Sequence, residues 1–138
     1  MNSQLSDQPA RDKALNIKHS YIVQAPAGSG KTGLLTLRFL KLLTISESPE
    51  QIVAITFTRK AASEMRDRII KTLSWTKDLK ANKSRPNEGF DHQRFTVAEK
   101  VLARDLELNW GLLTNPSRLR IQTIDAFCFY LANKLPVL

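Results

Sequence analysis

The sequence contains few of the residues that stabilise secreted or metal-binding folds. It has one cysteine, Cys128, so no disulfide can form within the chain. That cysteine and the two histidines show no spacing typical of a zinc site. These absences favour a reducing compartment, and we expect the protein in the cytoplasm.

Long apolar runs are also missing. No stretch approaches the roughly 20 apolar residues that a membrane-spanning helix needs. Residues 1–20 contain Asp7, Arg11, Asp12 and Lys13 and lack the apolar centre of a signal peptide. We therefore expect no membrane partner.

Acidic residues are scarce relative to basic ones. The chain has 21 Lys and Arg against 13 Asp and Glu, which gives a formal net charge of +8. Such an excess favours anionic partners, namely nucleic acid, nucleotides or an acidic membrane surface. Charge alone does not choose among them, and a merely basic soluble surface explains it equally well. The length of 138 residues suits one domain with a modest core.

The spacing of apolar residues predicts strands and helices in alternation. Short β-favouring runs stand at 21–23, 52–57 and 119–123. Helical spacing predicts helices from 31 to about 46–49, over 59–73, over 95–108 and over 124–134, with a short helical face at 10–17. This order predicts an α/β fold with a parallel sheet flanked by helices.

Two of these segments carry more specific expectations. The run at 52–57 is apolar almost throughout, which favours a strand covered on both faces. Residues 74–95 are polar and irregular, so we expect a loop or a poorly ordered insertion there.

Residues 25–32 match the Walker A pattern of phosphate-binding loops, with alanine at the first glycine position. They are Ala25, Pro26, Ala27, Gly28, Ser29, Gly30, Lys31 and Thr32. The glycines permit the backbone to bring successive amides around a phosphate, at the positive end of the following helix. Lys31 would reach the β- and γ-phosphates, and the Thr32 hydroxyl would bind Mg²⁺. The pattern predicts a nucleotide-phosphate site.

A second group of polar residues stands where the strand at 52–57 meets the next helix. Thr56, Arg59 and Lys60 could hold a phosphodiester together with backbone amides, and Phe57 could stack on a base. Thr58 is placed to cap the helix. The residues alone favour a simpler interpretation, in which Phe57 is core and the two cations are solvated.

A third segment, 121–127, repeats this arrangement with Thr123 and Asp125 at a junction of strand and helix. Asp125 is most simply a helix N-cap. The alternative is a Walker B carboxylate that holds Mg²⁺ through water. It is disfavoured because Arg120 and Gln122 interrupt the strand and no glutamate follows Asp125.

Taken together, the segments 25–32, 55–65 and 121–128 resemble the opening motifs of UvrD-like superfamily 1 DNA helicases, closest to the RecB and AddA helicase–nuclease branch. The resemblance implies a P-loop, RecA-like motor domain that moves 3′ to 5′ along single-stranded DNA with ATP and Mg²⁺. Lys31 and Thr32 would match its catalytic ATP and Mg²⁺ residues.

The same resemblance implies DNA contacts. Thr56, Phe57, Thr58 and Arg59 would match one DNA-contact motif, and Thr123 and Asp125 would match the next. Most relatives have histidine where this chain has Asp125, and a carboxylate there would repel phosphate. Gln8 stands at a plausible distance for the family's adenine-reading glutamine.

Several parts of such a motor have no counterpart in the sequence. A Walker B pair, a second motor domain and a nuclease carboxylate cluster are all missing from it. We therefore expect 1–138 to be the N-terminal part of an incomplete first motor domain, whether a truncated gene product, a designed piece or a proteolytic fragment. It should be nearly inactive alone, could work with a nuclease or helicase partner, and could self-associate through an exposed sheet edge.

Two other classes of function remain open. A small self-contained P-loop kinase would need Asp125 as a true Walker B residue and arginines in a lid. A non-catalytic basic module would bind nucleic acid in a steeply salt-dependent way without using Lys31.

Overall fold

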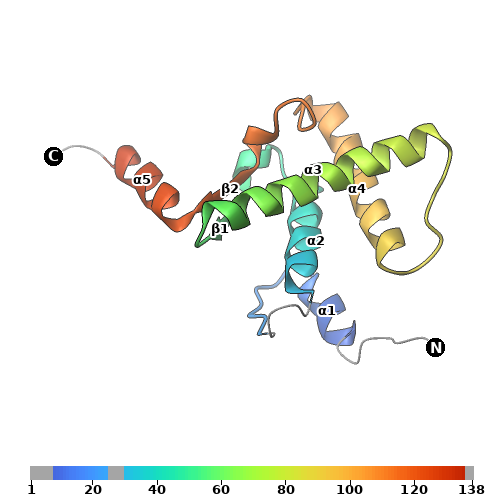
Figure 1. Ribbon diagram of the computed structural model, residues 1–138, viewed down its shortest axis with the longest axis horizontal. Coiled ribbons are helices and arrows are strands. Elements are labelled where there is room, and N and C mark those ends of the chain that lie inside the picture. Colours follow the sequence, from blue (N-terminus) through green and yellow to red (C-terminus); the bar gives the residue numbers. More distant parts are fainter. Residues whose placement is uncertain (1–7, 25–29, 136–138) are drawn as a thin grey trace.

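The computed structural model describes residues 8–24 and 30–135 (Figure 1). Its elements, in chain order, are α1 (Gln8–Ala14), α2 (Lys31–Leu43), β1 (Val53–Thr56), α3 (Arg59–Ala81), α4 (Gly89–Leu108), β2 (Arg120–Thr123) and α5 (Ile124–Lys134). Single 3₁₀ turns at Pro49–Gln51 and Pro116–Arg118 precede the two strands. The fold is mixed α/β, with a small parallel sheet of two strands in the described part of the chain.

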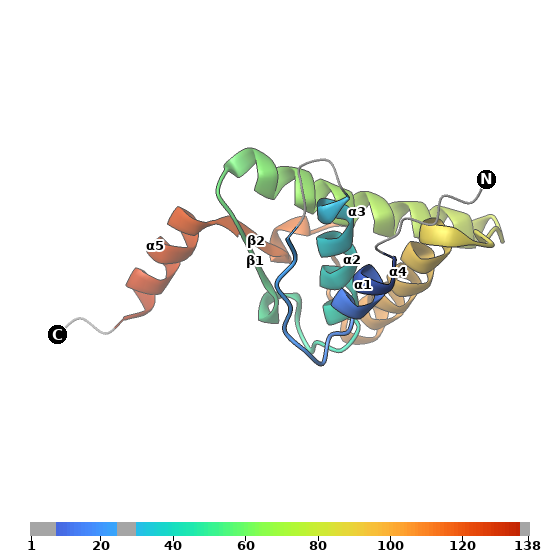
Figure 2. The ribbon, with the colours of Figure 1, turned by 90° about the horizontal axis from the view of Figure 1, so that it is seen from below.

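The core lies among α2, α3 and α4, which gather on one side of the sheet (Figures 1 and 2). Side chains from all three helices are fully buried there, among them Leu40, Leu43, Ile69, Leu73 and Val101 at 0% exposure. On α3 they recur every three or four residues, the period that puts side chains on one face of a helix. Most of the apolar burial therefore belongs to helix packing.

The sheet pairs β1 with β2 in a register that sets Val53 opposite Arg120 and Thr56 opposite Thr123. Paired residues share a face, so Ala54 and Ile121 both point towards the core. Arg66 of α3 reinforces this side by donating a 2.7 Å hydrogen bond to the Ile121 carbonyl.

In the described part of the chain the other face of the sheet is largely exposed, and the expectation of a strand buried on both faces is wrong. Val53 and Ile55 are 38% and 47% exposed. Tyr130 of α5 approaches this face, and its ring lies 4.5 Å from the Arg120 guanidinium. Packing on the core side alone leaves β1 half exposed.

The strand expected at 21–23 is also absent, since residues 20–24 are irregular. The chain just before them is held to α2 instead of joining the sheet. Arg38 donates hydrogen bonds to the carbonyls of Ala14, Asn16 and His19 at 2.6, 3.1 and 2.8 Å. Ile22 is consequently 91% exposed.

Residues 74–95 are mostly helical, which corrects the expected loop. Helix α3 continues to Ala81 and α4 begins at Gly89, so only 82–88 connects them. Although the segment is mostly polar, a few of its residues pack in the interior. Thr76 is fully buried, and the ring centres of Trp75 and Phe95 lie 6.1 Å apart in an edge-to-face arrangement. Elsewhere α2 ends at Leu43, before the predicted 46–49.

Helix α5 extends away from the helical body in both views (Figures 1 and 2). None of its residues is buried, and Phe129 and Leu131 are 71% and 45% exposed. Helix α5 and the preceding strand β2 lie where the sequence predicts them.

Candidate nucleotide and DNA site

The phosphate-loop prediction falls partly outside the described residues. Ala25, Pro26, Ala27, Gly28 and Ser29 are not described, whereas Gly30, Lys31 and Thr32 are. Gly30 adopts the left-handed conformation, with φ 84°, and its carbonyl accepts the first helical hydrogen bond from the Leu34 amide at 3.1 Å. Glycine suits this position because a side chain would be strained there. Helix α2 therefore starts where the motif requires.

Lys31 and Thr32 occupy the first turn of α2, and both are exposed. The N-terminal turn of a 13-residue helix carries amides that make no bond within the helix, and a partial positive charge. An ammonium and a hydroxyl at that position are the groups that a magnesium-bound nucleotide phosphate needs. The described part of the loop thus carries groups suited to a nucleotide phosphate with Mg²⁺.

Arg11 is a basic residue near the loop that sequence reasoning missed. Its Nη1 lies 3.5 Å from the Gly30 carbonyl oxygen, and a Cβ placed on Gly30 would lie 3.1 Å from the same nitrogen. Glycine at position 30 therefore also makes room for the arginine. No pattern in the sequence could have found this contact, because it joins α1 to a loop 19 residues away.

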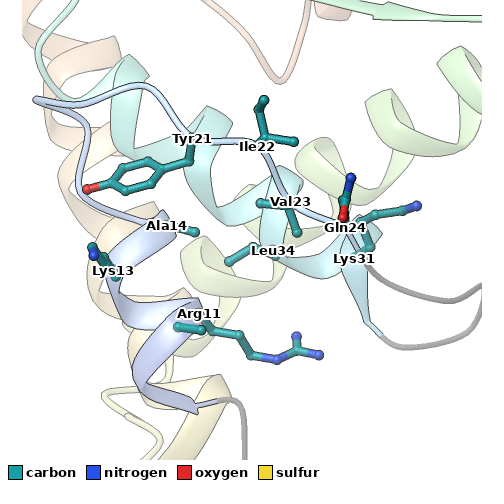
Figure 3. A pocket seen from close by; sticks show the side chains of 10 residues that line it. Arg11, Lys13, Ala14, Tyr21, Ile22, Val23, Gln24, Lys31 and Leu34 are labelled. Atoms are coloured by element: carbon teal, nitrogen blue, oxygen red, sulfur yellow. The ribbon is translucent and has the colours of Figure 1, made fainter.

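A cavity of about 250 Å³ lies between α1, residues 21–24 and the start of α2 (Figure 3). Arg11 and Lys13 line it from α1, and Gln24 and Lys31 line it on the opposite side. The concentration of cations gives the cavity a positive potential beside the start of α2. Arg38 sets its shape by holding the carbonyls at the end of α1.

Gln8 lies beside a second cavity of about 250 Å³, which is also lined by Gly30 and Gly33. The structure therefore places this residue near the loop, as an adenine-reading residue would require. Its side-chain amide donates a 2.9 Å hydrogen bond to Asp12, so the donor is engaged within α1.

The predicted DNA-contact residues come together at the carboxyl edge of the sheet. Thr56 and Thr123 are register partners at the ends of β1 and β2. Each strand leads directly into a helix whose N-cap is a threonine: Thr58 accepts from the Ala61 amide at 3.1 Å, and Thr123 from the Ala126 amide at 3.2 Å. The N-termini of α3 and α5, which carry partial positive charge, therefore lie at one edge of the sheet. Ligands of parallel sheets bind at this edge.

Phe57 stands between β1 and α3 with 90% of its surface exposed. The interpretation of this residue as core is therefore wrong: β1 ends one residue before it, and the chain turns outward into α3. Arg59 and Lys60 are exposed beside it, as expected of solvated cations, and Thr58 is confirmed as an N-cap. An exposed aromatic ring flanked by cations is suited to stacking and phosphate contact.

Asp125 does not cap α5, contrary to the simplest interpretation of the sequence. Thr123 has that role, and Asp125 lies exposed in the first helical turn. A carboxylate there is favourable towards the positive end of the helix. It does not end a buried strand, which is where a Walker B carboxylate stands.

The amino edge of the sheet is built differently. Arg118 donates to both carboxylate oxygens of Glu50 at 2.7 and 3.1 Å, and Arg120 donates to the Glu50 carbonyl at 3.3 Å. The hydrogen bond from Arg118 holds the pKa of Glu50 below its ordinary value. These contacts join the turns that precede β1 and β2, so they fix the strand register from the end opposite to the candidate site.

Within the described residues, no three His, Cys, Asp or Glu side chains are grouped closely enough to hold a metal ion. No helix in that part of the chain combines the length and the apolar character that a membrane span requires.

Residues 7–136 match the family described as UvrD/REP helicase N-terminal domain. The chain belongs to this family. The match covers residues 25–32 and both strand–helix junctions at the carboxyl edge. The UvrD-like resemblance of the three sequence segments is thereby confirmed.

Individual relatives agree with the UvrD/REP assignment. The chain is 32% identical over 126 residues to an ATP-dependent helicase/nuclease subunit of Desulfitobacterium hafniense, covering 89% of the chain and 8% of the relative. It is 36% identical over 114 residues to the protein of the same name in Clostridium perfringens, covering 80% and 7%. It is 49% identical over 75 residues to DNA helicase IV of Escherichia coli, covering 53% and 11%.

The chain thus spans a small fraction of the length of these relatives, 7–11% of each. No solved structure matches it.

Proposed function

We propose that this chain is the ATP-binding, N-terminal part of a DNA helicase motor that acts on single-stranded DNA in recombination or repair. Its described elements would form part of a RecA-like first motor domain spanning 1–138. The observation that supports this most strongly is the pairing of Thr56 with Thr123, which brings two helix starts and the exposed Phe57 to one sheet edge. Family membership supplies the ATP-dependent helicase class.

Lys31 and Thr32 carry the nucleotide side of the proposal. The Lys31 ammonium would neutralise the outer phosphates, and the Thr32 hydroxyl would ligate Mg²⁺. Ala25 to Gly30 would supply backbone amides around the phosphates. Gln8 would read adenine from α1, provided that its amide leaves Asp12. Bound ATP would supply the phosphoanhydride whose cleavage drives movement.

The carboxyl edge of the sheet carries the DNA side. Phe57 would stack on a base, and Thr56, Thr58, Arg59 and Lys60 would contact the backbone. Thr123 would contact the adjoining nucleotide from β2. Asp125 would keep its own side chain away from phosphate, because both groups are anionic.

Turnover needs more than these residues. Phosphoryl transfer requires a carboxylate that orients Mg²⁺ and water, and arginines that stabilise the transition state. Among the described residues, no group of three His, Cys, Asp or Glu side chains adds metal ligands to Thr32. We infer that the chain alone hydrolyses ATP slowly and needs a second motor domain.

The names of the relatives extend the proposal to the whole protein. The name helicase/nuclease subunit suggests assembly with a partner that completes a helicase–nuclease. A cytoplasmic location would follow from such DNA processing. In isolation, the uncovered face of β1 and the apolar surface of α5 would favour self-association.

The two other functional classes fit less well. Membership of a helicase family argues against a self-contained kinase. A basic module that ignores nucleotide would bind DNA equally well after loss of Lys31 and would not bind ATP at all.

Calorimetric titration with Mg²⁺·ATP tests the nucleotide site. Lys31→Ala should weaken binding about 10- to 100-fold, since a charged hydrogen bond contributes roughly 1.5–3 kcal/mol. Lys41→Ala, at the other end of α2, removes the same charge and should leave the affinity within about twofold. Thr32→Ala should remove the advantage of Mg²⁺ over EDTA. Equal affinities of the parent and Lys31→Ala would contradict the proposal.

A further inference from the structure

A cavity of about 310 Å³ lies between α2, α3 and α4, away from the sheet edge. Its floor includes Leu37 and Leu40, which are 1% and 0% exposed. Trp75 of α3 and Phe90 of α4 also line it. The volume lies at the lower end of the range for small-ligand sites, and the floor is formed by rigid helices. We call it the α3–α4 cavity.

The polar part of this cavity is basic. Arg68, Lys71 and Arg94 line it, and none of the described residues that line it is a carboxylate. In the described part of the chain, the side chains of Arg68 and Lys71 are exposed and have no hydrogen bond or ion pair. Two such cations over an apolar floor are suited to an anion that carries a flat apolar group.

Arg94 has a different role from the other two cations. Its guanidinium lies 4.3 Å from the centre of the Trp75 ring and pairs with Asp91 at 3.0 Å. These contacts hold the indole and the guanidinium together as one flat wall. Phe90 keeps 51% of its surface exposed and so still offers a ring face.

The cavity is connected to the candidate DNA site by a single helix. Helix α3 starts at the Thr58 cap and carries Lys71 about 13 residues later, which corresponds to about 20 Å along its axis. A few nucleotides of a single strand can cover that distance. Lys60 and Arg68 lie along this path, although Glu64 lies on the same face of the helix.

We propose that the α3–α4 cavity binds one nucleotide of single-stranded DNA beyond the sheet edge. The base stacks on Phe90 against the Trp75–Arg94 wall, and the phosphate binds Arg68 and Lys71. The site rests on the proposed function, because it extends the DNA path that begins at Phe57.

Intrinsic fluorescence and labelled DNA test this site in the 138-residue chain. The chain has two tryptophans, and Trp110 is only 4% exposed, so quenching that disappears in Trp75→Phe reports the cavity. A thymidine oligonucleotide should quench this signal. Arg68→Gln with Lys71→Gln should weaken its binding about tenfold and reduce the slope of log affinity against log salt by about 0.7, because the two cations bind one phosphate.

A matched control removes the same charge elsewhere. Lys41→Gln with Lys100→Gln alters a different cavity and should leave both the affinity and the slope nearly unchanged. Phe90→Ala should weaken binding without changing the slope, because it removes stacking but no cation. Circular dichroism verifies that each variant keeps its helices.

Three results would overturn the site. The first is that the oligonucleotide does not quench Trp75 fluorescence. The second is that the Arg68/Lys71 and Lys41/Lys100 double variants lose equal DNA affinity. The third is that free thymidine monophosphate binds as tightly as the oligonucleotide. The last result would assign the cavity to free nucleotides. DNA binding that depends on Phe57 but not on Arg68 or Lys71 would contradict the α3–α4 cavity as a DNA site. It would not contradict the proposed function.

Discussion

The helical body and the sheet edge of this molecule are built on opposite principles. In α2, α3 and α4, large apolar side chains such as Leu40 and Ile69 are fully buried. At the carboxyl edge of the sheet, Phe57 is 90% exposed and α5 has no buried residue. Close packing stabilises the folded state, whereas exposed aromatic rings and helix N-termini are available to bind ligands. The comparison teaches that stability and binding should respond to different substitutions.

The largest expected effect is in the helical body. Leu40→Ala should lower the free energy of unfolding by about 2–5 kcal/mol, because it leaves a cavity in a closed core. Leu131→Ala removes the same atoms from α5, where the leucine is 45% exposed, and should change stability by less than about 0.5 kcal/mol. Urea unfolding followed by circular dichroism measures both. Similar losses would show that α5 is packed as firmly as α2.

Removing the two threonine N-caps should have effects on stability of intermediate size. Thr58→Ala should cost about 1 kcal/mol, because α3 loses its cap and α3 belongs to the core. Thr123→Ala removes an equivalent bond from α5 and should cost less in global unfolding, since α5 can fray without opening the core. Thr58→Ser should restore most of the loss. A larger effect at Thr123 would reverse the assignment of the two regions.

The smallest effect concerns the amino edge of the sheet. Arg118 lowers the pKa of Glu50 in the folded state, so the pair stabilises the fold above the ordinary glutamate pKa. That contribution is lost as the pH falls through the lower folded-state value. The Glu50 side chain is 43% exposed, so the loss should stay below about 1 kcal/mol.

Stability curves of the parent and Glu50→Gln, measured from neutral to acidic pH, isolate this contribution. The two proteins should differ at neutral pH and converge in acid. A difference that grows as the pH falls would have the wrong sign for this ion pair.

The parts of the fold that the sequence predicted are those with local signals. The start of α2 after Gly30, the strand–helix junctions at Thr58 and Thr123 and the parallel pairing of two strands all follow from caps, glycine and apolar spacing. Residues 74–95 were misassigned because their exposed helical faces are polar and only a few residues, such as Thr76, are buried.

Other features depend on contacts between distant segments and had no local signal. Residues 21–23 have strand-forming side chains, yet Arg38 fixes the neighbouring backbone to α2. The apolar run at 52–57 suggested burial on both faces, but in the described residues the buried core lies on the Ala54 side, and Val53 and Ile55 stay partly exposed. The contact of Arg11 with Gly30 likewise arises from tertiary packing.

The most direct test of the sheet edge compares two exposed phenylalanines in DNA binding. Anisotropy of a labelled thymidine oligonucleotide should show that Phe57→Ala weakens binding about fivefold or more, because stacking on one base contributes roughly 1–3 kcal/mol. Phe129→Ala, which removes a 71% exposed ring from α5, should change the affinity by less than about twofold. Unchanged binding by Phe57→Ala, or an equal loss in both variants, would contradict a DNA site at the ends of β1 and β2.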